Sequence, residues 1–140
     1  MNIKNISTLA IALGLLTACA TTPAPAPVVK TTLGEVEFKQ LADAAYYADK
    51  YVEREQKFSS LMVRDDLTPT QHALTYWYRG TSRGVWVNDG PYASPYCSVE
   101  DLQISLNMAP EHPKKQSALE NLEYQKSRYQ YFTRPESCGN

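Results

Sequence analysis

Two histidines, three cysteines and two pairs of neighbouring acidic residues are the side chains that could do chemistry in this chain. A hydrolase would need a serine or cysteine nucleophile beside a histidine base and a carboxylate. His72 comes near an expected helix start, where we expect solvent, and His112 lies between two prolines. The acidic pairs at 65–66 and 100–101 are typical of a turn and a helix start. The sequence therefore predicts a protein that is not an enzyme and needs no cofactor or metal.

The amino terminus has the pattern of an export signal. Lys4 precedes an apolar run from Ile6 to Leu16, which is about 11 residues long, whereas a membrane-spanning helix needs roughly 20. The run therefore fits the hydrophobic part of a signal peptide. The segment Leu16-Thr17-Ala18-Cys19-Ala20 follows, and it resembles the lipobox of bacterial lipoproteins. The resemblance implies that Cys19 is acylated, with palmitate or similar chains, and that residues 1–18 are removed. The alternative is an ordinary secretory signal with an incidental cysteine.

A lipidated Cys19 would attach the chain to a membrane, because two or three acyl chains anchor a protein stably. Ala20 stands where an aspartate would retain a lipoprotein in the inner membrane, so resemblance to the enterobacterial pattern implies the outer membrane, facing the periplasm. The inner membrane and the cell surface stay open. Alternating prolines at 23, 25 and 27 predict an extended tether. The expected organisation is a signal peptide at 1–18, a lipidated tether at 19–33 and a periplasmic domain at 34–140.

Cys97 and Cys138 remain as a pair once Cys19 carries lipid. The periplasm is oxidising, so we expect a disulfide between them. It would close a loop of about 40 residues and stabilise the fold by roughly 4 kcal/mol in the chain-entropy interpretation. A redox pair or a metal site is the alternative, but neither cysteine belongs to a Cys-x-x-Cys pair and the histidines are not spaced as ligands.

The composition narrows the classes of partner. Charged residues make up 21% of the chain, the net charge is −1 and no basic stripe is visible. Nucleic-acid binding normally shows as a clustered positive face, so we expect no nucleic-acid partner. Ten tyrosines and two tryptophans are many for 140 residues. Such side chains serve both as half-buried core edges and as anchors in protein interfaces.

Apolar residues spaced three and four apart predict a helical domain. One helix is expected from Gly34 to about Val63, with an apolar face that is regular up to Val52 and less regular beyond it. A second helix is expected to begin after Thr68, which can cap its first turn. Proline follows at the first helical position, and Gln71 completes a capping box. This second helix should stop near Gly84.

Two further helices complete the predicted bundle. A capping pattern at Ser98 opens a short helix that prolines at 110 and 113 end, and the last helix runs from about Lys114 to Phe132. The residues expected to face inward on that last helix are Ala118, Leu119, Leu122, Tyr129 and Phe132. Residues 85–96 are predicted as a surface loop. The fold class is therefore all-α, a small bundle of about four helices with one disulfide.

Positions 70–110 have the pattern of a helical hairpin. Aromatic residues precede an Arg-Gly pair at 76–80, and a second helical stretch at 98–110 ends in proline. This pattern resembles one tetratricopeptide repeat, in which small residues let two antiparallel helices approach closely. The chain departs from that family through extra residues between the helices and through Ser98, where alanine is usual. The resemblance implies protein or peptide binding in a helical groove, and a convergent hairpin is the alternative.

Surplus aromatic residues are the candidate binding sites. Tyr76, Trp77 and Tyr78 are consecutive on a helix and about 100° apart, so they cannot all face one core. They are either core and rim residues or an anchor for a partner. Trp86 and Tyr92 lie in the long loop, which either contacts a partner or ligand, or only covers the hairpin.

These features predict a membrane-anchored periplasmic lipoprotein that acts as a non-catalytic adaptor in the assembly of an envelope complex, as pilotins do. The alternative is an inhibitor or immunity protein that plugs a toxin or cell-wall hydrolase with residues 86–96. A structural envelope component without a specific partner also stays open. The adaptor hypothesis expects an aromatic helical groove around Tyr76, Trp77 and Tyr78, and the inhibitor hypothesis expects a protruding loop.

Overall fold

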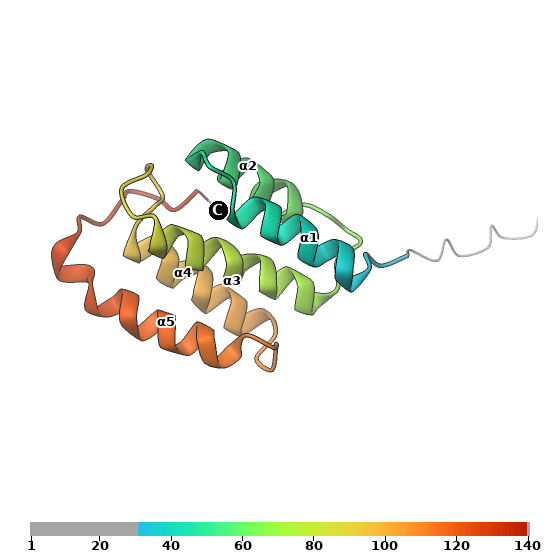
Figure 1. Cartoon of the computed structure of the whole chain (residues 1–140). Coiled ribbons are helices and arrows are strands. Elements are labelled where there is room, and N and C mark those ends of the chain that lie inside the picture. The colour runs from blue at the N-terminus through green and yellow to red at the C-terminus, as the bar shows by residue number, and fades with distance from the viewer. Residues whose placement is uncertain (1–30, 140) are drawn as a thin grey trace, which may run out of the picture.

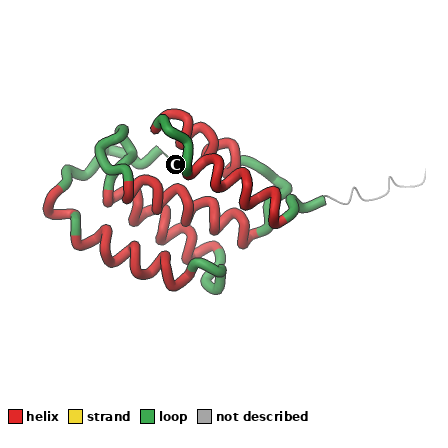
Figure 2. Tube along the Cα trace, viewed as in Figure 1, coloured by secondary structure: helices red, strands yellow, loops and turns green. Residues whose placement is uncertain are grey.

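A computed structural model describes residues 31–139, and within them the chain forms five α-helices, one short 3-10 turn and no strand (Figures 1 and 2). The helices are α1 (Glu35–Tyr46), α2 (Tyr51–Met62), α3 (Pro69–Val85), α4 (Pro95–Met108) and α5 (Lys115–Ser127), and the 3-10 turn is Tyr129–Tyr131. The predicted small all-α bundle is confirmed. None of these helices is long and apolar enough to cross a membrane. The predicted signal peptide, Cys19 and most of the tether lie outside the described residues.

A chain reversal divides the first predicted helix into two. The prediction of one helix from Gly34 to about Val63 is wrong, because four residues between α1 and α2 turn the chain back on itself. The Arg54 guanidinium donates to the carbonyl oxygens of Ala48 and Asp49, 3.0 and 3.3 Å away. These bonds join α2 to carbonyl groups that follow the end of α1, and so hold the reversal in place.

Burial of apolar side chains from both helices in one core explains the reversal. Phe38 on α1 and Phe58 on α2 belong to one buried cluster, which also contains Leu33, Ala42, Ala45, Leu61 and Leu67. A continuous helix would hold the two phenylalanines about 30 Å apart, at 1.5 Å per residue. Val52, which the pattern places on the core face, is 62% exposed. Leu33 was expected in the tether, but it lies in this cluster.

Two helices begin with a hydroxyl residue followed by proline. The capping box of α3 is confirmed: the Gln71 backbone N–H donates to Thr68 Oγ1 at 3.1 Å, and the Thr68 N–H donates to Gln71 Oε1 at 2.8 Å. Helix α4 begins in the same way, with Ser94 as its cap and Pro95 at its first position. The predicted start at Ser98 is wrong, because proline suits a first turn whose N–H groups lack helical partners.

The carboxyl-terminal helix is shorter than predicted. Helix α5 stops at Ser127, and the 3-10 turn then carries Tyr129 onto the ring of Tyr96, with centroids 4.1 Å apart. Ala118 and Leu122 are buried as expected, whereas Leu119 is exposed. The stacked tyrosines hold the end of the chain against the start of α4.

Helix α3 is the centre of the bundle. It lies between α1 and α5 in Figure 1, with α4 packed behind it. The first buried cluster lies between α1, α2 and α3. A second cluster joins α4 and α5 and consists of Val99, Leu102, Ala118 and Leu122. Because α3 contacts both clusters, its side chains decide how the two halves of the domain meet.

Helices α3 and α4 form an antiparallel hairpin with an unusually close contact (Figure 1). A Cβ atom on Gly80 would lie 2.9 Å from the Asp101 Cβ and 3.1 Å from the Ser98 carbonyl oxygen, so only glycine fits there. The Ser98 hydroxyl donates to the Gly80 carbonyl at 2.7 Å, and the Ser105 hydroxyl donates to the Ala73 carbonyl at 2.6 Å. Small and hydroxyl residues thus allow the two backbones to approach.

The predicted disulfide is confirmed. Cys97 in the first turn of α4 is bonded to Cys138, with Cα atoms 5.2 Å apart. Both cysteines are buried. The bond fixes the tail after the 3-10 turn against the start of α4, and Gly139 in that tail packs against the Tyr92 ring with a φ of 63°.

Candidate functional site

One face of α3 carries an apolar stripe that remains partly open to solvent. Residues three and four apart share a helix face, and here they form a line between α1 and α5. We call this line the α3 seam, and it consists of Leu74, Trp77, Tyr78, Thr81 and Val85. Leu74 and Tyr78 pack against the first cluster, whereas Trp77 packs against the second. The seam therefore lies over the junction of the two halves of the domain.

Aromatic rings from three segments meet at the seam. Trp77 and Tyr78 touch edge to face, with centroids 4.8 Å apart. The Tyr46 ring at the end of α1 lies 6.1 Å from Tyr78 and 5.0 Å from Trp86. Tyr47 lies 4.9 Å from Tyr46 and is mostly exposed. The result is a continuous aromatic surface that runs from α3 to the reversal after α1.

A hollow of about 330 Å³ opens at the Leu74 end of the seam, and its lining is mostly apolar. Leu74 and Tyr78 form one side, and Val36 and Phe38 of α1 form another. Val36 is 75% exposed. The Lys114 ammonium lies at the rim, 5.3 Å from the centre of the Trp77 ring. This hollow could receive an apolar side chain or a short peptide segment.

Two polar atoms of the seam have no hydrogen-bond partner among the described residues. They are Trp77 Nε1 and Thr81 Oγ1, and both atoms are shielded from solvent. A buried polar atom without a partner costs about 1–3 kcal/mol. These two unsatisfied atoms therefore lower the stability of the fold at the seam.

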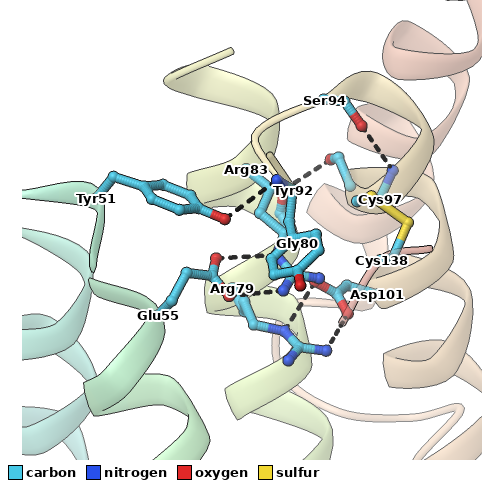
Figure 3. A network of polar contacts seen from close by, with 11 residues as sticks. Tyr51, Glu55, Arg79, Gly80, Arg83, Tyr92, Ser94, Cys97, Asp101 and Cys138 are labelled. Atoms are coloured by element: carbon cyan, nitrogen blue, oxygen red, sulfur yellow. Dashed lines mark hydrogen bonds and ion pairs between the residues drawn. A yellow bond between two sulfur atoms is a disulfide. The ribbon is translucent and has the colours of Figure 1, made fainter. Parts of the chain in front are cut away.

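The opposite face of α3 holds a buried network of charged side chains (Figure 3). The Arg79 guanidinium donates to both oxygens of Asp101, at 3.0 and 2.6 Å. Arg83 donates to Asp101 at 3.0 Å and to both oxygens of Glu55 at 3.0 and 2.6 Å. Two cations and two carboxylates thus neutralise one another and join α2, α3 and α4.

The electrostatics of this network favour a structural role. Asp101 is completely shielded from solvent. Burial raises the pKa of the Asp101 carboxyl, and the positive charges of Arg83 and Arg79 oppose that rise. Hydrogen bonds occupy both carboxylate oxygens, so Asp101 has no open side from which it could exchange a proton with a substrate.

The structure separates the three consecutive aromatic residues. Trp77 and Tyr78 lie on the seam, whereas Tyr76 lies on another face, where its ring is 5.3 Å from the Arg79 guanidinium. The Tyr78 hydroxyl donates to Asp43 at 3.2 Å. Burial and the Asp43 carboxylate raise the pKa of Tyr78 to about 12. Tyr78 is therefore neutral in the physiological range and presents an uncharged ring to the hollow.

The loop between α3 and α4 is held against the domain at both ends. Arg54 lies 4.6 Å from the centre of the Trp86 ring and pairs with Asp89 at 2.5 Å. The Tyr92 backbone N–H donates to the Tyr51 hydroxyl at 3.1 Å. Trp86 therefore extends the aromatic surface, whereas Tyr92 packs on the other side of the domain, beside Arg83.

The sequence did not single out several residues of these arrangements. Arg79, Arg83 and Glu55 were not expected to form a buried network, and Leu74 and Val36 were not proposed as binding residues. The spacing of Arg79 and Arg83 could have indicated that they act together, because residues four apart lie on the same face of a helix, and the other face of this helix is apolar. The carboxylates that pair with them come from other helices, which helical periodicity cannot identify.

His112 is buried between α4 and α5 and is held on both ring nitrogens. Its Nδ1 accepts from the Lys114 backbone N–H at 3.1 Å, so Nε2 carries the proton and faces the Ser105 hydroxyl at 3.2 Å. Burial lowers the pKa of His112 below its usual value of 6.5. The folded protein therefore holds His112 in its neutral form.

Acidification is expected to destabilise the domain through His112. The unfolded chain binds this proton at a higher pH than the folded chain, so stability is complete above about pH 6.5 and falls as the pH drops below it. Urea unfolding at pH 7.5, 6.5 and 5.5 measures this loss. His112→Gln should show a flatter profile over the same range, and an equally steep profile in that variant would contradict the assignment.

His112 and Ser105 are in contact, but both are buried and the Ser105 hydroxyl is committed to a backbone carbonyl. Within residues 31–139, no three histidine, cysteine or acidic side chains are grouped so that they could hold a metal ion. A scan against protein-family models found no match, and comparisons with curated proteins and with solved structures found no significant match either.

Proposed function

We propose that this chain is a membrane-anchored periplasmic lipoprotein, a non-catalytic adaptor that binds a protein partner at the α3 seam during assembly of an envelope complex. The observation that carries the proposal is the open aromatic surface around Trp77 and Tyr78, which ends in an apolar hollow. The lipid anchor follows from the lipobox resemblance at Cys19, outside the described residues.

The chemistry of the seam suits a protein partner. Interface hot spots are enriched in tryptophan and tyrosine, and they lie in pockets from which water is excluded. The seam offers Trp77, Tyr78 and Trp86 close together, with exposed valines at its two ends. An apolar helix or extended segment could lie between α1 and α5 and cover these rings.

The arrangement of charged groups supports the non-catalytic part of the proposal. Arg79, Arg83 and Asp101 are all buried, and both arginines bond to the Asp101 carboxylate. Using any of them in a reaction would break the contacts that join α3 to α4. We therefore interpret the network as the support that holds the seam in shape.

The inhibitor hypothesis has less support in the loop between α3 and α4. A plug would need apolar side chains that project from the loop tip. Trp86 and Tyr92 instead pack back against the domain, and the exposed residues near the tip are Asn88, Asp89 and Pro91. The seam therefore has the better chemistry for a partner.

A paired substitution of exposed valines tests the seam. Val36 of α1 lines the hollow at one end of the seam, and Val85 is the last seam residue at the other end. These two residues are 75% and 56% exposed. Replacing both by glutamine should reduce partner recovery by about tenfold or more, because hot-spot truncations cost about 1–2 kcal/mol or more. The measurement is affinity purification with quantitative mass spectrometry from native envelope, using protein tagged after Asn140.

The matched control is the double variant Val52→Gln with Val63→Gln. These valines are 62% and 82% exposed and lie on α2 and just after it, away from the seam. All four substitutions are on the surface, so the melting temperatures should stay close together. Equal recovery of the same partners with both double variants would refute the seam as the binding site.

A further inference from the structure

The apolar hollow lies beside the point where the chain enters the domain. The Leu33 N–H donates to the Asp66 carbonyl at 2.8 Å, and the Leu33 carbonyl accepts from the Gln71 side chain at 3.0 Å. These bonds fix Leu33 at the start of α1. The next residues along α1, Glu35 and Val36, already line the hollow. Whatever precedes Thr31 is therefore attached within a few residues of this opening.

The segment that precedes the domain is unusually apolar for a tether. Residues 20–29 contain no charged side chain, and the run Pro23-Ala24-Pro25-Ala26-Pro27-Val28-Val29 contains no polar side chain at all. The three prolines lack a backbone donor and restrict the chain to extended conformations. The run therefore offers consecutive apolar side chains on a backbone that lacks three of its donors.

We infer that residues 23–29 dock onto the Leu74 end of the α3 seam and cover the hollow. Pro-rich segments bind grooves lined by aromatic rings, because the extended chain loses little entropy on binding. The hollow offers the Tyr78 ring, Pro113 and the exposed Val36.

The lengths agree with this arrangement. Seven residues in the extended proline-rich conformation span about 22 Å, at 3.1 Å per residue. The seam from Leu74 to Val85 is about 17 Å long, at 1.5 Å per helical residue. The segment is therefore long enough to cover the hollow and reach the aromatic rings beyond it.

The short connection makes even a weak contact effective. A segment attached through a few residues has an effective concentration on the order of 1 mM. A contact with a dissociation constant of about 1 mM would then be roughly half occupied within one molecule. Residues 23–29 therefore need no high affinity for the hollow, and a tightly binding protein partner can displace them.

The consequence for regulation rests on the proposed function. If a partner uses the α3 seam, the docked segment competes with it for the hollow. Removing residues 20–30 should then raise the affinity for that partner by about twofold, which is the factor that half occupancy imposes. The docking itself does not depend on whether such a partner exists.

The test compares two chains, residues 20–140 and residues 31–140. All five helices, both buried clusters and the disulfide lie within residues 31–139, so the shorter chain contains every contact of the described fold. Methyl NMR spectra report on Val36 and Leu74 in the hollow and on Val52 and Val63 elsewhere. We expect the Val36 and Leu74 signals to differ between the two chains and the Val52 and Val63 signals to coincide.

A variant of the longer chain completes the test. Replacing Pro25, Pro27 and Val28 by serine should return the Val36 and Leu74 signals to their positions in the shorter chain. Replacing Thr21 and Thr22 by serine should leave them unchanged. Coincident Val36 and Leu74 signals in the two chains, or equal changes at all four residues, would overturn the docking. The seam could still bind a partner in that case, because the valine variants made in the 31–140 chain test that binding separately.

Discussion

Replacing Asp101 by alanine is expected to lower the free energy of unfolding by about 3–5 kcal/mol. The substitution removes the shared acceptor of two buried cations, since Arg79 and Arg83 both bond to this carboxylate. Breaking a buried ion pair from one side leaves charge without compensation in a medium that solvates it poorly. A domain of this size is stable by only about 5–15 kcal/mol, so the loss should be large. Urea denaturation followed by circular dichroism measures it.

Glu100 provides the control beside Asp101. It is the preceding residue on α4, but it is exposed, so Glu100→Ala should change stability by no more than about 0.5 kcal/mol. Asp101→Asn keeps the shape and one acceptor oxygen and should lie between the alanine variant and the wild type. If Asp101→Ala unfolds at the same urea concentration as Glu100→Ala, the buried network does not join α3 to α4 as described.

Removing the disulfide is expected to be the second large effect. Replacing Cys97 and Cys138 by alanine frees a loop with a sequence separation of 41, and a loop of this length corresponds to about 4 kcal/mol in the chain-entropy treatment. The tail also holds the Tyr92 ring through Gly139. We therefore expect a lower unfolding midpoint and a tail that proteases cleave more readily.

Treatment with a reducing agent distinguishes the effect of losing the disulfide bond from the effect of replacing the cysteine side chains. In the chain of residues 31–140 these are the only two cysteines. Dithiothreitol should therefore lower the midpoint of the wild-type chain toward that of the double alanine variant. The variant itself should not respond. If the double alanine variant unfolds at the same midpoint as the oxidised wild-type chain, the helices alone fix the tail and the disulfide adds no stability.

The two predictions concern the same part of the domain. The network joins α3 to α4 from within, and the disulfide fixes the start of α4 to the tail. The network holds α3 against α4, and the disulfide holds α4 against the tail, while the seam is the outer face of α3. Destabilised variants should therefore lose partner binding together with stability, whereas the exposed valine variants should separate the two effects.

The sequence by itself determined the local features of the fold. Helical periodicity, the capping box at Thr68 and Gln71, and the cysteine pair all depend on neighbouring residues or on redox chemistry, so they could be recognised without tertiary structure. The all-α class and the disulfide were predicted for this reason. The lipobox at Cys19 and the tetratricopeptide resemblance remain predictions, since the described residues and the comparisons do not test them.

Only the tertiary structure decided where the first helix breaks. The apolar spacing continues across residues 47–50, so periodicity favours one helix. Phe38 and Phe58 can share a core only if the chain reverses between them. The start of α4 was missed for a similar reason. Ser94 and Ser98 are both plausible caps, and packing of the Ser98 hydroxyl against the Gly80 carbonyl selects Ser94.

The candidate site was also only partly visible in the sequence. The surplus of aromatic residues pointed to Trp77 and Tyr78, but it could not tell that Tyr76 lies on another face. It also could not tell that Tyr46 and Trp86 come from distant segments to join them. The charged network was hidden because Arg79 and Arg83 look like solvent-facing residues until Asp101 and Glu55 are placed beside them. Local sequence sets which residues share a helix face, and contacts between distant helices decide which of those faces become core and which become surface.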